Sequence, residues 1–363
     1  MNTSSLCFIN ERINSTIQSL IEQVTEQMFT GNSDHFHVLA VANILNQIDR
    51  FGALGATGDS DALYEIHKAL YHVNEMEVAH PTPQGHKYQF NPIFLSIRSR
   101  LEHWADSYEN ARRPANLKNL GVNETLAEII NIWKTHNSAN HPIFEYVRTE
   151  ATKEAVLEYL KSDYLLNIRF YDLVVYSLVG IDERVRFEVA HNLWDEVGQG
   201  DLAKTHVQLY RDLLKSEGIN ANLKSMSEHL SWQGLAGYNL MMRHGLHKEL
   251  YFESLGSLAV TELADPEQYK KFVEGCRRVG VGANNAGGLA YYEEHISVDV
   301  IHGEGWLENV IRPLLESYPE SSHLMLWGVY QRLNTAKDYW DELLGRLKRI
   351  DAHQHEKSIG VIA

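Results

Sequence analysis

The chain has 363 residues, 44% of them hydrophobic and 22% charged, which is ordinary for a soluble protein that can bury a large core. Its net charge of −15 disfavours nucleic-acid binding and docking on anionic lipid, since both need a basic face. The two cysteines, Cys7 and Cys276, exclude a cysteine-based metal site and a disulfide framework. No secretory signal or membrane-length apolar run is present, so we expect a cytoplasmic protein.

Apolar residues repeat with helical spacing from the first segments onward. Ile17, Leu20, Ile21 and Val24 share one helix face. With eight prolines and no run typical of β-hairpins, the pattern predicts an all-α fold. Further helices are predicted at residues 61–77, 90–112, 123–136, 151–179, 182–197, 200–216, 225–243, 247–263, 266–279, 287–316 and 321–349.

The chain changes character at a polar break from Lys134 to His141, which ends at Pro142. We therefore predict an N-terminal helical region at 1–138 and a helical bundle at 139–355. The first region carries no readable motif, and a role in homodimerisation or as a pocket lid is compatible with it. The bundle contains every segment whose residue types suggest chemistry.

The first such segment runs from Asn192 to His206 and holds acids, glycines and a histidine. Glu196 and His206 are ten residues apart, which a regular helix would leave about 80° out of line. Gly198 and Gly200 would allow the backbone to correct this. The second segment places Glu262 in an apolar helix just before Asp265-Pro266, where a buried carboxylate needs a partner.

The third segment is the most informative, because His295, Asp299 and His302 have helical spacing i, i+4 and i+7. At about 100° per residue these side chains share one stripe of the helix. Two imidazoles and a carboxylate suit a divalent metal of intermediate hardness. Bundle cores build dinuclear sites from such residues on facing helices.

An alternative donor set lies on the segment 182–197. Glu188, His191 and Asp195 also share a helix face. Glu188 with His191, combined with Asp299 and His302, forms the doubled acid-x2-His pattern of ferritin-like diiron proteins. The sequence therefore leaves open whether Glu188 or Glu196 supplies the first carboxylate.

Three motifs in this order resemble the heme-oxygenase-like diiron oxidases and oxygenases, a family of iron-containing redox enzymes. They are the Asp-Glu-x-Gly-x-Gly stretch leading to His206, the Leu-Gly-x-Leu-x3-Glu helix of Glu262, and His295-x3-Asp299-x2-His302. The resemblance covers roughly residues 141–316, and the third motif is its most specific part. Some relatives place the first acid seven residues before its histidine, where this chain has Gln199.

This resemblance implies a heme-oxygenase-like bundle with two Fe(II) ions and O2 as co-substrate. The implied metal ligands are Glu196, His206, Glu262, His295, Asp299 and His302. The implied reaction is oxidation of a small amino-acid-like amine or acid in specialised metabolism, by N-oxygenation, desaturation or oxidative C–C cleavage. An external electron donor is compatible with this chemistry.

Two other classes of function stay open: a heme-binding protein of the same fold and a metal-free helical protein. Gly280 to Gly288 resembles a dinucleotide loop, but a helical segment precedes it and the glycine spacing is wrong, so we expect a plain loop. We expect Tyr291, Tyr292 and Trp306 to be core residues.

Overall fold

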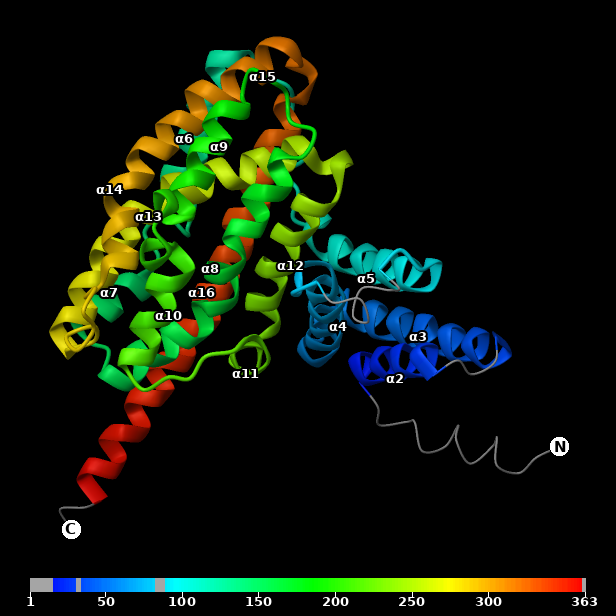
Figure 1. The fold of residues 1–363 in the computed structure, drawn as a ribbon, viewed down its shortest axis with the longest axis horizontal. Coiled ribbons are helices and arrows are strands. Elements are labelled where there is room, and N and C mark those ends of the chain that lie inside the picture. The colour runs from blue at the N-terminus through cyan, green and yellow to red at the C-terminus, as the bar shows by residue number, and fades with distance from the viewer. Residues whose placement is uncertain (1–15, 31–33, 82–88, 361–363) are drawn as a thin grey trace. The chain divides into compact units, whose positions relative to one another are not determined.

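A computed structural model describes residues 16–30, 34–81 and 89–360, so that Cys7 lies outside the described part. All regular secondary structure in these residues is helical, which confirms the predicted all-α fold (Figure 1). In the same ranges, no helix combines the length and apolar character that crossing a bilayer requires. Contacts divide the chain into two units, Met1–Arg112 and Arg113–Ala363.

In its described residues, the N-terminal unit consists of four amphipathic helices around one apolar core. Its buried side chains include Ile17, Ile44, Ile66 and Ile97, one from each helix. The helices are α2 (Ile17–Thr30), α3 (Asp34–Gly55), α4 (Ser60–Val78) and α5 (Pro92–Asn110).

The second unit is a larger helical bundle. Its short turns are η2 (Gly198–Gly200), η3 (Leu202–Lys204), η4 (Lys248–Leu250), η6 (Pro319–Ser321) and a π-helical segment η5 (Trp306–Ile311). Its helices are α6 (Val122–Thr135), α7 (Pro142–Thr149), α8 (Lys153–Leu178), α9 (Arg186–Glu196), α10 (His206–Ser216), α11 (Leu223–Ser227), α12 (Trp232–Leu246), α13 (Tyr251–Val279), α14 (Ala290–Gly305), α15 (Arg312–Ser317) and α16 (Ser322–Gly360).

The boundary between the units falls earlier than the predicted one between residues 138 and 139. Helix α6, which the polar break at Lys134 assigns to the first region, packs against α13, α15 and α16. The buried residues Leu126, Ile129 and Ile132 provide its contact face. Apolar burial against the bundle thus groups α6 with the residues that follow it.

Helix α13 continues through Pro266, where the sequence predicts a break between two helices. Proline lacks the N–H that would bond to the carbonyl of Glu262, four residues earlier, and in isolation this costs about 3 kcal/mol. Packing of α13 on both α14 and α16 offsets that cost. The approach to α16 is close: a Cβ at Gly328 would overlap the backbone carbonyl of Glu253. The result is one continuous helix that carries Glu262 through the centre of the bundle.

Candidate metal centre

His295, Asp299 and His302 lie on the face of helix α14 that points into the bundle. Their exposed fractions are 7%, 3% and 2%. The helix packs on α13 and α10 (Figure 1). Because these side chains are buried, they face the neighbouring helices rather than water. Buried polar side chains need partners, and each of these three lies beside potential metal-binding side chains of other helices.

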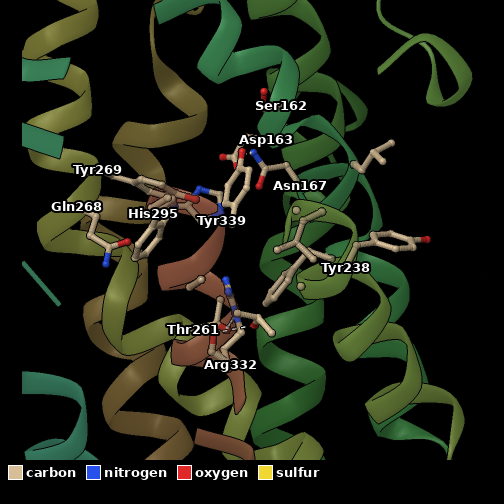
Figure 2. A pocket seen from close by; sticks show the side chains of 18 of the residues that line it. Ser162, Asp163, Asn167, Tyr238, Thr261, Gln268, Tyr269, His295, Arg332 and Tyr339 are labelled. Carbon is tan, nitrogen blue, oxygen red and sulfur yellow. Dashed lines mark hydrogen bonds between the residues drawn. The ribbon is translucent and has the colours of Figure 1, made fainter. Parts of the chain in front are cut away.

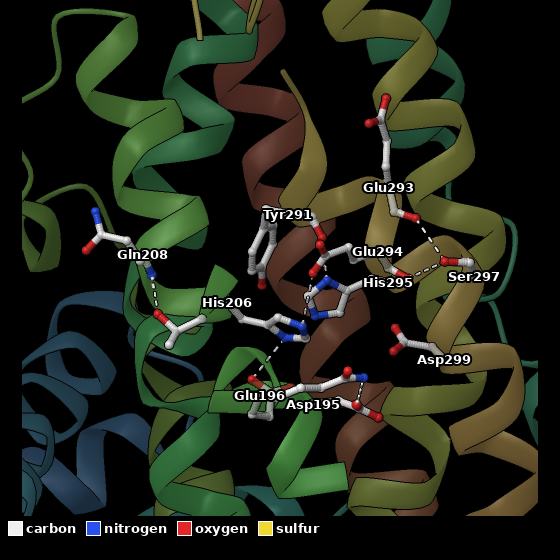
Figure 3. Close-up of polar contacts among 12 residues, drawn as sticks. Asp195, Glu196, His206, Gln208, Tyr291, Glu293, Glu294, His295, Ser297 and Asp299 are labelled. Carbon is white, nitrogen blue, oxygen red and sulfur yellow. Dashed lines mark hydrogen bonds and ion pairs between the residues drawn. The ribbon is translucent and has the colours of Figure 1, made fainter. Parts of the chain in front are cut away.

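Glu196, His206 and His295 form the first group of potential metal-binding side chains, called group one here. One ligand atom from each lies within 4.8 Å of the other two, and all three residues are buried. His206 Nδ1 is 3.0 Å from Glu196 Oε2, and the rings of His206 and His295 have centroids 4.3 Å apart. Figure 3 shows the three side chains converging from α9, α10 and α14.

A tight turn between α9 and α10 brings Glu196 and His206 together. Gly198, Gln199 and Gly200 have φ of 62°, 55° and 90°, so the right-handed helix α9 cannot continue through them and the chain turns. A Cβ at Gly198 would lie 2.6 Å from the carbonyl carbon of Lys204, which only glycine avoids. The predicted helix at 200–216 therefore begins only at His206. This turn brings Glu196 and His206 to the same site despite their ten-residue separation, as the two glycines predicted.

Glu262, Asp299 and His302 form the second group, called group two here. His302 Nδ1 lies 3.3 Å from Glu262 Oε2 and 3.7 Å from Asp299 Oδ1. Asn192 Nδ2 lies 3.0 Å from both Glu262 Oε1 and His302 Nδ1. Both groups draw on the α14 stripe, with His295 in group one and Asp299 and His302 in group two, so the two groups are neighbours.

The structure places the alternative donors differently. Glu188 accepts a hydrogen bond from Asn309 Nδ2 at 2.9 Å, and His191 is exposed. Neither belongs to group one or group two. Asp195 does reach the site, because its Oδ2 lies 2.9 Å from His302 Nε2.

A family model described as iron-containing redox enzyme matches residues 157–337, a range that contains all six residues of groups one and two. The chain belongs to this family. The resemblance predicted from the three motifs is thereby confirmed, and so is the oxidoreductase class.

Nitrosourea synthase from Streptomyces achromogenes subsp. streptozoticus is 29% identical to this chain over 133 residues. The match covers 34% of this chain and 26% of that protein. The two proteins are thus similar along one segment, about a quarter of the length of the relative.

The donor set of this family member fits divalent iron. Three imidazoles and three carboxylates supply nitrogen and oxygen ligands of the kinds that iron takes in bundle cores. His206 Nδ1 is buried and makes no hydrogen bond of normal geometry, although Glu196 Oε2 is 3.0 Å away. A buried imidazole nitrogen and a carboxylate oxygen placed in this way suit binding to a shared cation better than a direct hydrogen bond. Burial of three carboxylates also calls for positive charge.

A hydrogen bond orients the ring of His295 for a metal. Its Nδ1 lies 2.6 Å from the carbonyl oxygen of Tyr291, so Nδ1 donates and Nε2 keeps its lone pair. Burial, together with the charge of His206, lowers the pKa of His295 to about 3. His295 is therefore a neutral imidazole at neutral pH, the form that binds metals.

Iron(II) affinity at group two is expected to rise with pH. Burial opposes protonation of His302, but hydrogen bonds to Asp299, Glu262 and Asp195 and the charge of Glu262 raise its pKa to about 11. A bound ion must displace that proton, so affinity should gain close to tenfold per pH unit below this value. Anaerobic iron(II) titrations at two pH values measure this, and a pH-independent affinity would contradict the proton displacement.

A pocket of about 960 Å³, its opening included, adjoins both groups. Glu196, Glu262, His295 and Asp299 contribute to its wall. Its wall combines aromatic and aliphatic side chains with polar ones, as is typical of a small-molecule site. Figure 2 shows the other polar residues around the pocket. They include Asp163, Asn167, Thr261, Gln268, Arg332 and Tyr339.

The sequence motifs do not include Asp163 and Arg332, the charged pocket residues outside groups one and two. Asp163 gave a usable signal, because it shares a helix face with Tyr159, Asn167 and Phe170. Arg332 gave none, since its partner Thr261 is 71 residues away in sequence. Of the residues predicted to be core, Tyr292 and Trp306 are fully buried, whereas Tyr291 is buried and also lines the pocket.

Proposed function

We propose that this chain is a non-heme diiron oxidase or oxygenase that uses O2 to oxidise a small amine or acid. The proposed ligands of the two iron ions are the six residues of groups one and two. The reaction would belong to specialised-metabolite biosynthesis, which the similarity to nitrosourea synthase supports. Repeated turnover would need an external electron donor.

The single observation that carries the proposal is the shared helix α14. It presents His295 to group one and Asp299 and His302 to group two, next to a common pocket. Two ferrous ions held there would supply the electrons that reduce O2. A site for one heme would need a proximal histidine and no carboxylate ligands, whereas each group here contains a buried carboxylate.

The residues of the chain prepare the site for this chemistry. The carbonyl of Tyr291 keeps the Nδ1 proton on His295, and Asn192 donates a hydrogen bond to Glu262. Buried aromatic rings surround the histidines: Tyr291 lies 4.5 Å and Tyr269 5.7 Å from the His295 ring, between centroids. These rings keep bulk water away from the ligands, which strengthens the electrostatic interactions inside.

Two oppositely charged side chains in the pocket point to the substrate class. Arg332 Nε donates to Thr261 Oγ1 at 3.0 Å, and Thr261 precedes the group-two residue Glu262. Asp163 accepts from Asn167 Nδ2 at 3.1 Å. Burial raises the pKa of Asp163 to about 6, while the Asn167 hydrogen bond and the charge of Arg332 lower it. Asp163 is thus largely ionised at neutral pH. The pair suits a molecule that carries both a carboxylate and an amine.

Replacing Arg332 with alanine is expected to lower kcat/KM for a carboxylate-bearing substrate about 10- to 100-fold, because charged hydrogen bonds contribute about 1.5–3 kcal/mol. Lysine at this position should restore part of the loss, since it keeps the charge but not the planar fork. Steady-state O2 consumption measures the effect. The exposed Arg349 on the same helix gives a matched alanine control that should behave as wild type. Equal losses with a substrate analogue lacking the carboxylate would contradict the anchor role.

The deciding experiment loads the chain with iron(II) without oxygen and then adds O2 with candidate amino acids, amines and carboxylic acids. The proposal predicts two irons per chain and a transient visible absorption that decays faster with one compound. A strong Soret band in the purified protein would instead identify a heme protein. Full activity in a metal-free preparation would show that no iron is needed.

A further inference from the structure

The ring of His302 is held on both of its nitrogen atoms. Nδ1 faces Glu262 and Asp299 of group two, at 3.3 and 3.7 Å. Nε2, on the opposite edge, lies 2.9 Å from Asp195 Oδ2. The side chains of His302 and Asp195 are 2% and 11% exposed, so water competes little for this contact. A carboxylate on the outer nitrogen of a histidine fixes the ring orientation and makes the inner nitrogen a better ligand.

A second contact holds Asp195 in place. Gln199 Nε2 donates to the other oxygen, Oδ1, at 2.9 Å. Gln199 is the only non-glycine residue with positive φ in the described ranges. A left-handed backbone is unfavourable for glutamine, and such strain persists where the surroundings impose it. The turn that brings Glu196 to His206 therefore also places Gln199 against Asp195.

We propose that Asp195 is a positioning residue for His302, and that Gln199 supports it through the strained turn. Asp195 accepts the Nε2 proton and directs Nδ1 toward the metal of group two. Since Asp195 precedes Glu196, the same end of α9 contributes a ligand to group one and orients a ligand of group two. This inference rests on the proposed diiron function and adds a residue to it.

The test compares iron binding by Asp195→Ala, Asp195→Asn and wild-type protein, using anaerobic iron(II) titration and Mössbauer spectroscopy. Positioning predicts that Asp195→Ala still holds two irons at saturation, with affinity at one position reduced about 10- to 100-fold. One ferrous quadrupole doublet should change and the other should not. The iron affinity of the Asp195→Asn variant is expected to lie between those of wild type and Asp195→Ala, because its amide oxygen still accepts from Nε2. The exposed Glu304, changed to Gln on α14, is the matched control and should bind iron as wild type does.

Gln199→Gly separates positioning from stability. Glycine relieves the left-handed strain, so the melting temperature should not fall, while the affinity of one iron should still decrease severalfold. A fall in both would assign Gln199 a merely structural role.

Two outcomes would overturn the proposal for Asp195. Iron binding by Asp195→Ala that matches wild type would show that the contact has no role. Binding of a single iron at saturation would make Asp195 a ligand itself.

Failure of the proposed function has a different signature, because wild-type protein would then bind no iron. In that case NMR of metal-free protein with labelled histidine tests the contact through the Nε2 proton of His302. A proton signal that is present in wild type and lost in Asp195→Ala supports the orienting contact. A wild-type protein without this signal overturns it.

Discussion

Replacing His302 with alanine is expected to reduce bound iron from two ions per chain to about one and to abolish substrate-dependent O2 consumption. His302 Nδ1 is the only nitrogen donor in group two, whose other members are the carboxylates of Glu262 and Asp299. Removing a ligand should weaken iron binding there by more than the roughly 10- to 100-fold that the loss of an outer partner costs. Anaerobic iron titration and an oxygen electrode measure the two effects.

The neighbouring His191 provides the control for this variant. Its ring centroid lies 6.4 Å from that of His302, yet its side chain is exposed and outside both groups. His191→Ala should therefore keep two irons and near wild-type turnover. A His302→Ala protein that still binds two irons and turns over would show that the assigned ligand set is wrong.

Replacing Glu196 with alanine is expected to remove iron from group one and to lower turnover by at least about 100-fold, whereas Glu188→Ala should keep both ions. Glu196 is 6% exposed and lies 3.0 Å from His206 Nδ1. Glu188 instead accepts a hydrogen bond from Asn309. The same titration and turnover assay, applied to the two variants side by side, distinguishes the two candidate carboxylates.

The Glu188 variant carries its own check. Losing the hydrogen bond from Asn309 should lower the free energy of unfolding by about 0.5–1.5 kcal/mol, which thermal unfolding detects without any change in iron content. Should Glu188→Ala lose iron while Glu196→Ala retains it, the ferritin-like arrangement of acids and histidines would replace the one proposed here.

Local sequence pattern was sufficient for the features that depend on residues close together in the chain. Helical periodicity predicted the all-α fold, and the spacing of His295, Asp299 and His302 predicted one inward stripe. Glycine identity at positions 198 and 200 predicted the turn between α9 and α10, because few other residues adopt positive φ. Each of these follows from the geometry of a few consecutive residues.

Local pattern failed where packing between distant segments overrides it. Pro266 normally ends a helix, yet contacts of α13 with α14 and α16 carry the helix through it. The position of α6 in the bundle likewise depends on apolar contacts with α16, which lies far along the chain. The packing energies of these contacts come from residues far apart in the chain, so the sequence around Pro266 or α6 does not reveal them.

Residue types and their spacing were enough to identify the fold class, the family and six side chains that suit iron. The packing of the helices was needed to show that Glu196 rather than Glu188 lies beside His206, that Asp195 contacts the outer nitrogen of His302, and that Asp163 and Arg332 line the same pocket. This division arises because a helix fixes the direction of its own side chains, whereas distances between helices are set by the packing of the whole bundle.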